Sequence, residues 1–594
     1  MHHFFPREPS KDKDWSPNKE EADATATTAT ATDRSDGDTV SVDVQTGVQE
    51  AEATTKVWSK THLIVAYILI WFIYFVDATQ QGMAGGLTPY ITSDFQQHSL
   101  TATTGIVSQL VGGLVKLPLA KILDIWGRPQ GFALTTFLLT VGLIMMAACN
   151  NVQAYAAAQV FYWVGFNGMG YSLSVFIADT SALKNRGLMF AFLYSPFIIT
   201  AWISGPIATS ALAGFGWRWA FGIFAIITPL VSLPLIILFA YNLRKARKLG
   251  LMPTPPPKVK AEEGDGQSRP WMRLVRHHLI QFDIIGLILV SAGLALFLLP
   301  FSIHSYQEAK WRSPLIICML VFGVVLLIGF ALYEKFLAPV QFLPYRLLVD
   351  RTILGAMLSA STVFVAFYIW DNYFSSFLQV VNGLNLTEAT YVGKIFTMGS
   401  CFWGLVTGLL IRITGRYKWL SLCFGVPVTM LGVGLMIHFR QPHTHIGWVI
   451  MCQILISLAG GTITICEQTA VMAVITHQHV AVVLAVLSMC SSIGGAIGST
   501  VSSALWTTIF PQKLAQHLPQ DAQANLTSIY GDLNVQLSYP VGSPTREAIS
   551  LAYGETQKTM LIAAVAVLVL SFVGVAVWRD VHLKEFKQTK GTVV

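Results

Sequence analysis

The chain has 594 residues, of which 53% are hydrophobic and only 12% are charged, and its formal net charge is +7. Soluble globular proteins carry about 25% charged residues, so the composition excludes a soluble enzyme and predicts a protein that crosses a lipid bilayer many times. The basic residues are spread over alternate loops and form no folded basic domain, so we expect no nucleic-acid partner.

The first 56 residues differ from the rest of the chain. They are rich in alternating Ala and Thr with scattered acids, and they offer little apolar surface to bury. This composition predicts a disordered tail. The tail lacks the basic start, apolar core and cleavage site of a signal peptide, so the first apolar segment is expected to be retained as the insertion signal.

Apolar runs of about 20 residues recur after the tail, and each is long enough to cross a hydrocarbon core of about 30 Å as a helix. Cytoplasmic loops are recognised by their Lys and Arg residues, and the longest basic loop runs from Asn242 to about Leu279. An even number of spans then places both termini in the cytoplasm. We expect about fourteen spans, beginning near His62, Thr104, Gly131, Ala154, Gly187, Trp217, Ile280, Ser313, Ile353, Tyr391, Lys418, Gly447, Ala481 and Thr559.

One arrangement of residues occurs twice. FIYFVD ends at Asp77 and is followed by AKILDIWGR, which ends at Arg128; AFYIWD ends at Asp371 and is followed by GLLIRITGR, which ends at Arg416. The repeat indicates a carrier of two related halves with its substrate path between them.

The basic turn of each copy is predicted to be a conformational hinge, because glycine permits a tight turn and an acid can pair with arginine in one conformation and release it in another. Arg412 stands in the second copy where the first has Asp124, so the two hinges are not expected to lock identically. Simple anchoring by positive charge at the membrane surface is the alternative. The hinge residues are Asp124, Gly127, Arg128, Arg412, Gly415 and Arg416.

Acidic residues inside apolar spans are costly and need an explanation. Asp77 and Asp371 lie about two-thirds of the way across their spans, towards the outside, after aromatic residues. A carboxyl in an apolar, partly wet site binds a proton readily, so we predict proton coupling at both, with helix-locking hydrogen bonds as the alternative. For Glu467, near the inner end of its span, a role in proton coupling and a purely structural role are expected equally. Lys116 is expected to reach partway towards the interface.

Residues 511–557 form the longest loop expected outside the membrane, and we expect either a substrate gate at Tyr539 and Tyr553 or a passive tether without structure of its own. Glycosylation sequons at Asn385 and Asn525 fall in loops that the charge rule also places outside. The seven cysteines lie in apolar runs without a metal-binding spacing, so no resident metal or cofactor is expected.

The stretch LAKILDIWGR resembles the signature of the major facilitator superfamily between its second and third spans. Asp124, Gly127 and Arg128 match that signature, whereas Ala120 and Ile125 depart from it. GWRWAF (216–221) and FDIIG (282–286) resemble its fourteen-span branch, in which two spans are inserted between two six-span halves.

The resemblance implies an all-α membrane protein with the major facilitator fold: two pseudo-symmetric six-helix bundles plus two inserted helices. We expect a cytoplasmic tail at 1–56, a first bundle at 57–241, a basic cytoplasmic loop at 242–278, inserted helices at 279–334, a second bundle at 335–580 and a cytoplasmic tail at 581–594.

A closer similarity is to the fungal siderophore–iron transporters. It covers residues 87–106, 116–132, 175–188, 477–499 and 539–557. It implies import of ferric hydroxamate siderophores with protons across the plasma membrane. We expect a monomer, and cycling of the protein through endosomes is compatible with its lysine-bearing tails. The iron would arrive already chelated, so the protein would need no metal ligands of its own.

A proton-coupled efflux carrier or exchanger of drug or glutathione type is the alternative on the same fold. The antiporter motif GxxxGP is incomplete here, because Ala201 stands where its first glycine belongs, and this favours import. A membrane oxidoreductase would need paired histidines in its spans and a nucleotide-binding domain, and the sequence offers neither.

A ferric siderophore is bulky and often neutral, so its recognition is expected to rest on aromatic and amide groups, with helix packing as the alternative role for each. The expected substrate-binding residues are Tyr74, Tyr171, Tyr194, Tyr368, Trp370, Tyr373 and Gln379.

Overall fold

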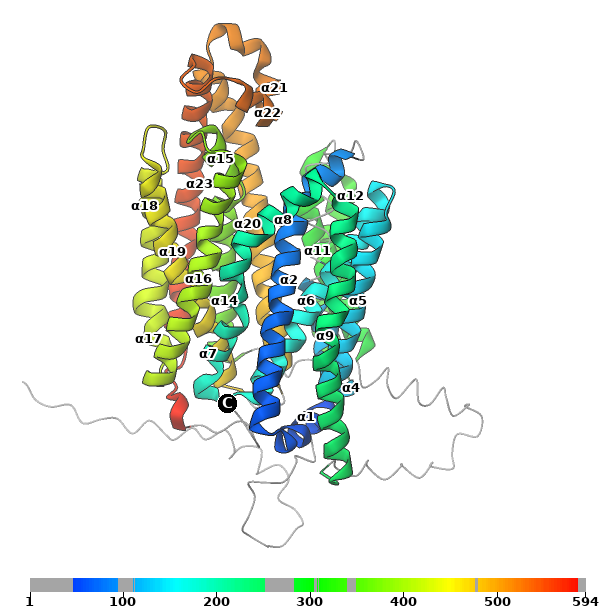
Figure 1. Ribbon diagram of the computed structural model, residues 1–594. Helices are drawn as coiled ribbons and strands as arrows, with labels where there is room; N and C mark the ends of the chain where they lie inside the picture. Colours follow the sequence, from blue (N-terminus) through cyan, green and yellow to red (C-terminus); the bar gives the residue numbers. More distant parts are fainter. Residues whose placement is uncertain are drawn as a thin grey trace, which may run out of the picture. The chain divides into compact units, whose positions relative to one another are not determined.

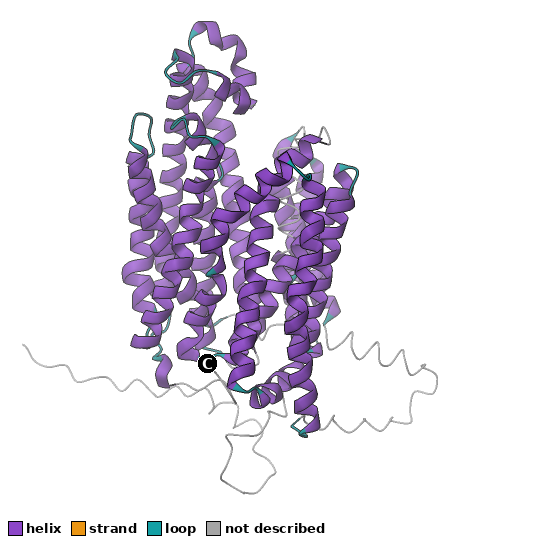
Figure 2. Cartoon of the chain, viewed as in Figure 1, coloured by secondary structure: helices purple, strands orange, loops and turns teal. Residues whose placement is uncertain are grey.

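The computed structural model describes residues 46–94, 111–251 apart from 112, 283–338 apart from 304–306 and 308, 349–475, and 479–585 apart from 532. Within these ranges the chain is helical and contains no strand (Figure 2). Helices are the expected outcome for long apolar segments, because a backbone surrounded by lipid has to satisfy its hydrogen bonds within the segment.

The first half of the chain is a bundle whose helices pack in neighbouring pairs, with α5 against α6 and α9, and α2 against α8 and α9. Close approach in the α5–α6 pair depends on glycine, because a Cβ at Gly165 would lie 2.2 Å from the backbone nitrogen of Leu139. The helices of this half are α2 (Lys60–Asp94), α4 (Lys116–Trp126), α5 (Arg128–Ala148), α6 (Val152–Thr180), α7 (Leu183–Tyr194), α8 (Pro196–Ala213) and α9 (Trp217–Lys248).

Two further helices, α11 (Ile284–Ile303) and α12 (Pro314–Phe336), pack on each other between the halves of the sequence. In the second half, α14 packs on α20 and α23, and α16 and α18 pack on α19. Its helices are α14 (Arg351–Asp371), α15 (Phe374–Val380), α16 (Leu386–Thr414), α17 (Lys418–Leu420), α18 (Val426–Phe439), α19 (Ile446–Ala473), α20 (Val480–His517), α21 (Leu526–Gly531), α22 (Leu533–Ser538) and α23 (Pro544–Ala576) (Figure 1).

Eleven helices of the described ranges are long and apolar enough to cross a membrane. The other three expected spans coincide with α4, α6 and the shorter α11, and most of the expected second span lies outside the described residues. The count of fourteen spans therefore stays a prediction. The two halves meet through α4 against α20 and through α7 and α8 against α16.

The expectation of a tail without structure up to residue 56 is wrong for its last part. Residues Thr46–Val57 form helix α1, which packs against α4, α6 and α9. Val48 and Ala53 on this helix are fully buried. Burial of these small apolar side chains against the bundle gives the helix a stabilising surface, which composition alone does not reveal. Residues 1–45 lie outside the described part.

The loop expected at 511–557 also has a structure. Helix α20 continues to His517, α23 begins already at Pro544, and a 3₁₀ turn (Gln520–Asn525), α21 and α22 connect them. We call residues 506–553 the cap; Figure 1 shows α20 and α23 extending past their neighbours to carry it. The expectation of an unstructured loop is therefore wrong, because the aromatic residues that the sequence places here form a core.

Tyr553 is one of these core residues, with its ring centroid 5.0 Å from that of Trp506 and 4.9 Å from that of Phe510. Its hydroxyl donates to Gln536 Oε1 at 2.9 Å. Tyr539 is half-buried at the edge of the cap. The proposed gating role of Tyr539 and Tyr553 is not tested by these contacts, which show Tyr553 as a packing residue. Asn385 and Asn525 are both exposed, as a glycosylation site requires, and their modification stays a prediction.

Arg546 fastens the cap to the bundle. Its guanidinium is buried and donates to the backbone oxygens of Gln379 (3.0 Å) and Val380 (2.8 Å) at the end of α15, and to that of Gln536 (2.5 Å) in α22. One side chain thus satisfies carbonyl groups from two segments that lie far apart in the sequence.

Arg546→Met is expected to loosen the cap, because each buried carbonyl left without a donor costs about 1–3 kcal/mol. The measurement is the rate of limited proteolysis within residues 518–543. Lys558→Met, at an exposed lysine of the same helix, is the control and should cleave like the unmodified protein. Equal rates for all three proteins would contradict the fastening role.

Candidate functional site

A central cavity of about 180 Å³ lies between the two halves. Helices α2, α4, α6, α7 and α8 supply its walls from the first half, and α19 and α20 supply them from the second. The lining residues combine aromatic, amide and hydroxyl side chains with one acid and one lysine: Tyr74, Asp77, Gln81, Lys116, Phe166, Asn167, Gly170, Tyr171, Ser174, Phe190, Tyr194, Phe197, Gln468, Leu484 and Ser488.

Asp77 is the acid of this cavity. Its side chain is 5% exposed, and its Oδ1 atom has no hydrogen-bond partner among the described residues. Asp77 also lies near Thr228 and Ser232 of α9, with no space for a water molecule between them. A carboxyl that is buried, unpaired and in contact with a cavity is well placed to exchange a proton with it.

Three of the expected substrate-binding residues meet at the cavity. Tyr74 and Tyr194 form an edge-to-face pair with ring centroids 6.0 Å apart, and the Tyr74 hydroxyl donates to the backbone oxygen of Gly170 at 3.0 Å. The hydroxyl of Tyr171 donates to the backbone oxygen of Ala481, so this side chain of the first half bonds directly to α20 of the second.

The other four expected residues are not among those that line this cavity. Trp370 is buried among Phe367, Phe374 and Phe396 and lines a separate void of about 300 Å³. Tyr373 stacks on Trp506 at 4.1 Å between centroids.

The contacts of Gln379 and Tyr368 are likewise those of packing residues. Gln379 is buried near the end of α15, and its amide donates to the backbone and side chain of Ser375 one turn earlier. The ring of Tyr368 lies against Gly495 of α20, where a Cβ would come within 2.9 Å of it.

Asp371 has surroundings unlike those of Asp77, although the sequence predicts equivalent roles. It is half-buried and faces the positive charges of Arg440 and Lys394. Arg440 itself is fully buried, donates to the backbone oxygen of Trp370 at 2.9 Å and lies 4.5 Å above the ring of Phe374. The second acid of the repeat thus feels the charges of two cations, and the first lies in a cavity wall.

Glu467 is not among the residues that line the cavity, whereas its neighbour Gln468 on α19 is. The Glu467 side chain is 5% exposed and its Oε2 atom has no hydrogen-bond partner within the described ranges. The structure leaves both of its expected roles open.

The first hinge is a buried network of charges. Arg128 Nε donates to Asp179 Oδ2 at 2.8 Å, and its Nη1 donates to Asp124 Oδ1 at 2.9 Å and to the backbone oxygen of Leu123 at 2.7 Å. Gly127 turns the chain between α4 and α5 at φ +106°, a conformation that favours glycine. Asp179, at the end of α6, is a residue of this network that the sequence pattern does not predict. Its position shortly before the basic residues Lys184 and Arg186 is the sequence feature that could have indicated it.

The second hinge is exposed. Arg416 and Asp580 are 3.8 Å apart with both side chains about half accessible, and Arg412 is exposed. Gly415 caps α16 at φ +74°, and Lys418 Nζ donates to the backbone oxygens of Ala576 and Trp578 at the end of α23. The expected difference between the two hinges is therefore present as a difference in burial.

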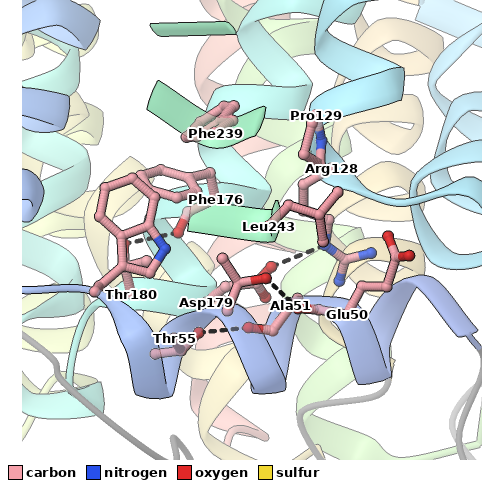
Figure 3. A pocket seen from close by; sticks show the side chains of 12 residues that line it. Glu50, Ala51, Thr55, Arg128, Pro129, Phe176, Asp179, Thr180, Phe239 and Leu243 are labelled. Atoms are coloured by element: carbon pink, nitrogen blue, oxygen red, sulfur yellow. Dashed lines mark hydrogen bonds and ion pairs between the residues drawn. The ribbon is translucent and has the colours of Figure 1, made fainter. Parts of the chain in front are cut away.

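Helix α1 covers the first hinge. Figure 3 shows Arg128 and Asp179 facing α1, which supplies Glu50, Ala51 and Thr55 to the same pocket. Glu50 Oε1 pairs with Arg247 of α9 at 3.0 Å. A Cβ at Gly47 would lie 2.5 Å from the backbone oxygen of Leu123, so the helix approaches the end of α4 closely.

Lys116 also differs from its expected position. The sequence predicts that it reaches towards the membrane surface, but its side chain lines the central cavity. Only the three-dimensional position of α4 relative to α6 and α20 turns this residue inwards, so the sequence pattern could not assign it.

Comparison with known proteins places the chain in a family. Residues 70–499 match the family model of the Major Facilitator Superfamily. The chain is 59% identical over 557 residues to MFS siderochrome iron transporter 1 of Ajellomyces capsulatus, covering 94% of this chain and 93% of the relative. The chain belongs to the siderophore iron transporter family of the major facilitator superfamily.

More distant members of the siderophore iron transporter family match over nearly the same length. Siderophore iron transporter mirB of Emericella nidulans is 43% identical and covers 93% of this chain and 90% of its own. Siderophore iron transporter 1 of Schizosaccharomyces pombe is 37% identical, covering 88% of this chain and 83% of its own. The family resemblance expected from five short stretches is thus confirmed along the chain.

The two hinges of this family member allow a matched test. Arg128→Gln leaves two buried carboxylates without their partner and is expected to cost about 3–5 kcal/mol of stability. Arg416→Gln removes an exposed ion pair and should cost about 0–1 kcal/mol. Thermal unfolding of the purified proteins in detergent measures both. Equal losses at the two positions would contradict the assignment of the buried network to the first hinge alone.

Gly47→Val is expected to detach α1, because the new side chain would meet the backbone of α4, which cannot move aside. Hydrogen–deuterium exchange of residues 46–57 should then rise towards that of an unprotected segment. Gly531→Val is the control, since a Cβ there meets open space. Unchanged protection of α1 in Gly47→Val would contradict its docked position.

Proposed function

We propose that this chain imports ferric siderophores, of the hydroxamate class, in symport with protons across the plasma membrane, with both termini cytoplasmic. The observation that carries the proposal is the central cavity, in which an unpaired acid faces aromatic and amide side chains from both halves. The printed names of the relatives, which describe siderophore or siderochrome iron transporters, support the choice of substrate.

The chemistry of the cavity suits such a cargo. Ligand pockets are lined mainly by apolar and aromatic groups with a few placed polar ones. A ferric trihydroxamate is neutral overall, since each hydroxamate contributes one negative charge to the trivalent iron. Neutral hydrogen-bonding side chains such as Asn167, Gln468 and Ser488 can contact its oxygens without a large desolvation cost.

The direction of transport rests on a sequence feature. Antiporters of the fourteen-span branch carry GxxxGP in their fifth span. In α8 of this chain, Ala201 occupies the position of the first glycine, and Gly205 and Pro206 match the end of the motif. The incomplete motif favours import over efflux or exchange. Movement of a radiolabelled ferric siderophore into or out of iron-starved cells separates the two directions.

Coupling to one proton can supply sufficient free energy. A proton moving down about 100 mV releases about 2.3 kcal/mol. A gradient of two pH units adds about 2.7 kcal/mol. The sum supports a solute gradient of about three to four decades. Asp77 is the proposed proton site, because its carboxyl faces the cavity without a neighbouring cation in contact, whereas Asp371 faces Arg440 and Lys394.

Asp77→Asn is expected to abolish proton-driven accumulation, because the amide cannot take up and release a proton. Exchange of labelled for unlabelled siderophore across the membrane should persist, since that process needs no net proton movement. The measurement is uptake by siderophore-uptake-null yeast that expresses the chain and receives one ferric siderophore at a time. Accumulation should fall as the external pH rises in the unmodified protein, and should lose this dependence in the variant.

Asp521→Asn, at an exposed acid of the cap, is the matched control and should accumulate siderophore normally. Accumulation at the unmodified level by Asp77→Asn, with its pH dependence intact, would refute the proton site. Absence of growth on every ferric siderophore, in yeast where the chain reaches the plasma membrane, would refute the proposed function itself.

A further inference from the structure

Lys116 is a cation in the wall of the central cavity that the transport mechanism above does not use. Its side chain is half-buried and reaches the cavity from α4, opposite the α2 residues Tyr74 and Asp77. Of the described residues that line the cavity, it is the one with a basic side chain. Within the described part of the chain, Lys116 forms no hydrogen bond or ion pair.

A lysine without a partner at membrane depth is unfavourable unless a cavity or a ligand receives its charge. Structural cations in this protein have such partners: Lys418 donates to two backbone oxygens, and Arg128 binds two carboxylates. Within the described residues the ammonium group of Lys116 has no such partner, and its side chain borders the cavity between the halves.

The charge of the cavity depends on two side chains. Asp77 and Lys116 line the same cavity but form no ion pair with each other in the described structure. The other polar groups around them are neutral amides, hydroxyls and phenols. When Asp77 is ionised the two charges cancel, and when Asp77 carries a proton the cavity has the single positive charge of Lys116.

We propose that Lys116 binds the iron-bound oxygens of the cargo and sets the charge selectivity of the carrier. The proposal deepens the proposed function and rests on it. The hydroxamate oxygens of a ferric complex carry partial negative charge, and an ammonium group offers three donors to them. A cargo that carries its own free amine meets the same positive charge and is disfavoured.

Proton binding then has a direct consequence for the cargo. Neutralising Asp77 leaves the charge of Lys116 uncompensated in a site of low dielectric, where its attraction for the oxygens of the complex is strengthened. The proton and the siderophore thus favour each other's binding without touching. Both groups face this one cavity, which places them in a common environment of low dielectric.

The test is binding by the purified protein, followed through quenching of tryptophan fluorescence. The probes are a neutral ferric trihydroxamate and a ferric trihydroxamate that bears a free amine. Lys116→Met is expected to weaken binding of the neutral complex about tenfold, or about 1.4 kcal/mol. The same variant should bind the amine-bearing complex as well as or better than the unmodified protein, so the preference between the probes is lost.

Lys116→Arg keeps the charge and should retain most of the preference for the neutral probe. Lys248→Met removes an exposed lysine at the end of α9 and should change neither affinity. Unchanged affinities for both probes in Lys116→Met would overturn the inference, and so would an equal loss for both. Failure of the unmodified protein to bind either probe would instead overturn the proposed function, so the two failures are distinguishable.

Discussion

The guanidinium of Arg128 joins two helices that form much of the cavity wall. It bonds to Asp124 on α4 and to Asp179 at the end of α6, and all three side chains are buried. Helix α4 also carries Lys116, and α6 carries Asn167 and Tyr171, so the relative position of these cavity residues depends on this one buried charge network. Burial makes the network strong and also makes it costly to break, because either carboxylate left alone would be an uncompensated charge in an apolar environment. Helix α1 covers the same network, with a small pocket between them.

The two halves of the chain repeat an architecture without repeating its energetics. The first copy of the repeated sequence has a buried hinge and an unpaired acid in the cavity. The second copy has an exposed hinge that is fastened to the end of α23, and its acid faces two cations. Proton binding and release favour a carboxyl with few cations around it, and Asp77 has fewer such neighbours than Asp371. The second half contributes instead the cap, which has an aromatic core and is bonded to the bundle by Arg546.

The cavity combines recognition and coupling in one space. Its neutral polar groups suit a cargo whose charges cancel internally, and the Asp77 and Lys116 pair gives the cavity a net charge that changes with one proton. Tyr171 bonds across the halves to Ala481 at the wall of the same cavity, so a change in how the halves meet changes the cavity as well. In the proposed mechanism, cargo, proton and conformation all act through this one cavity of the two-halved carrier.

The sequence by itself determined the helical membrane fold, the two related halves and the family, and it predicted most residues of the two hinges. These follow from local properties: apolar length, alternating basic loops, and a glycine and charges at a turn. It also identified Asp77, Tyr74, Tyr171 and Tyr194 as candidates for one site.

Only the tertiary structure decided which candidates share that site, because Trp370, Tyr373 and Gln379 look equivalent in sequence but pack elsewhere. It also decided that α1 and the cap are folded and that Lys116 faces the cavity. Contacts between segments far apart in the chain set these three outcomes, and no local pattern of residues encodes them.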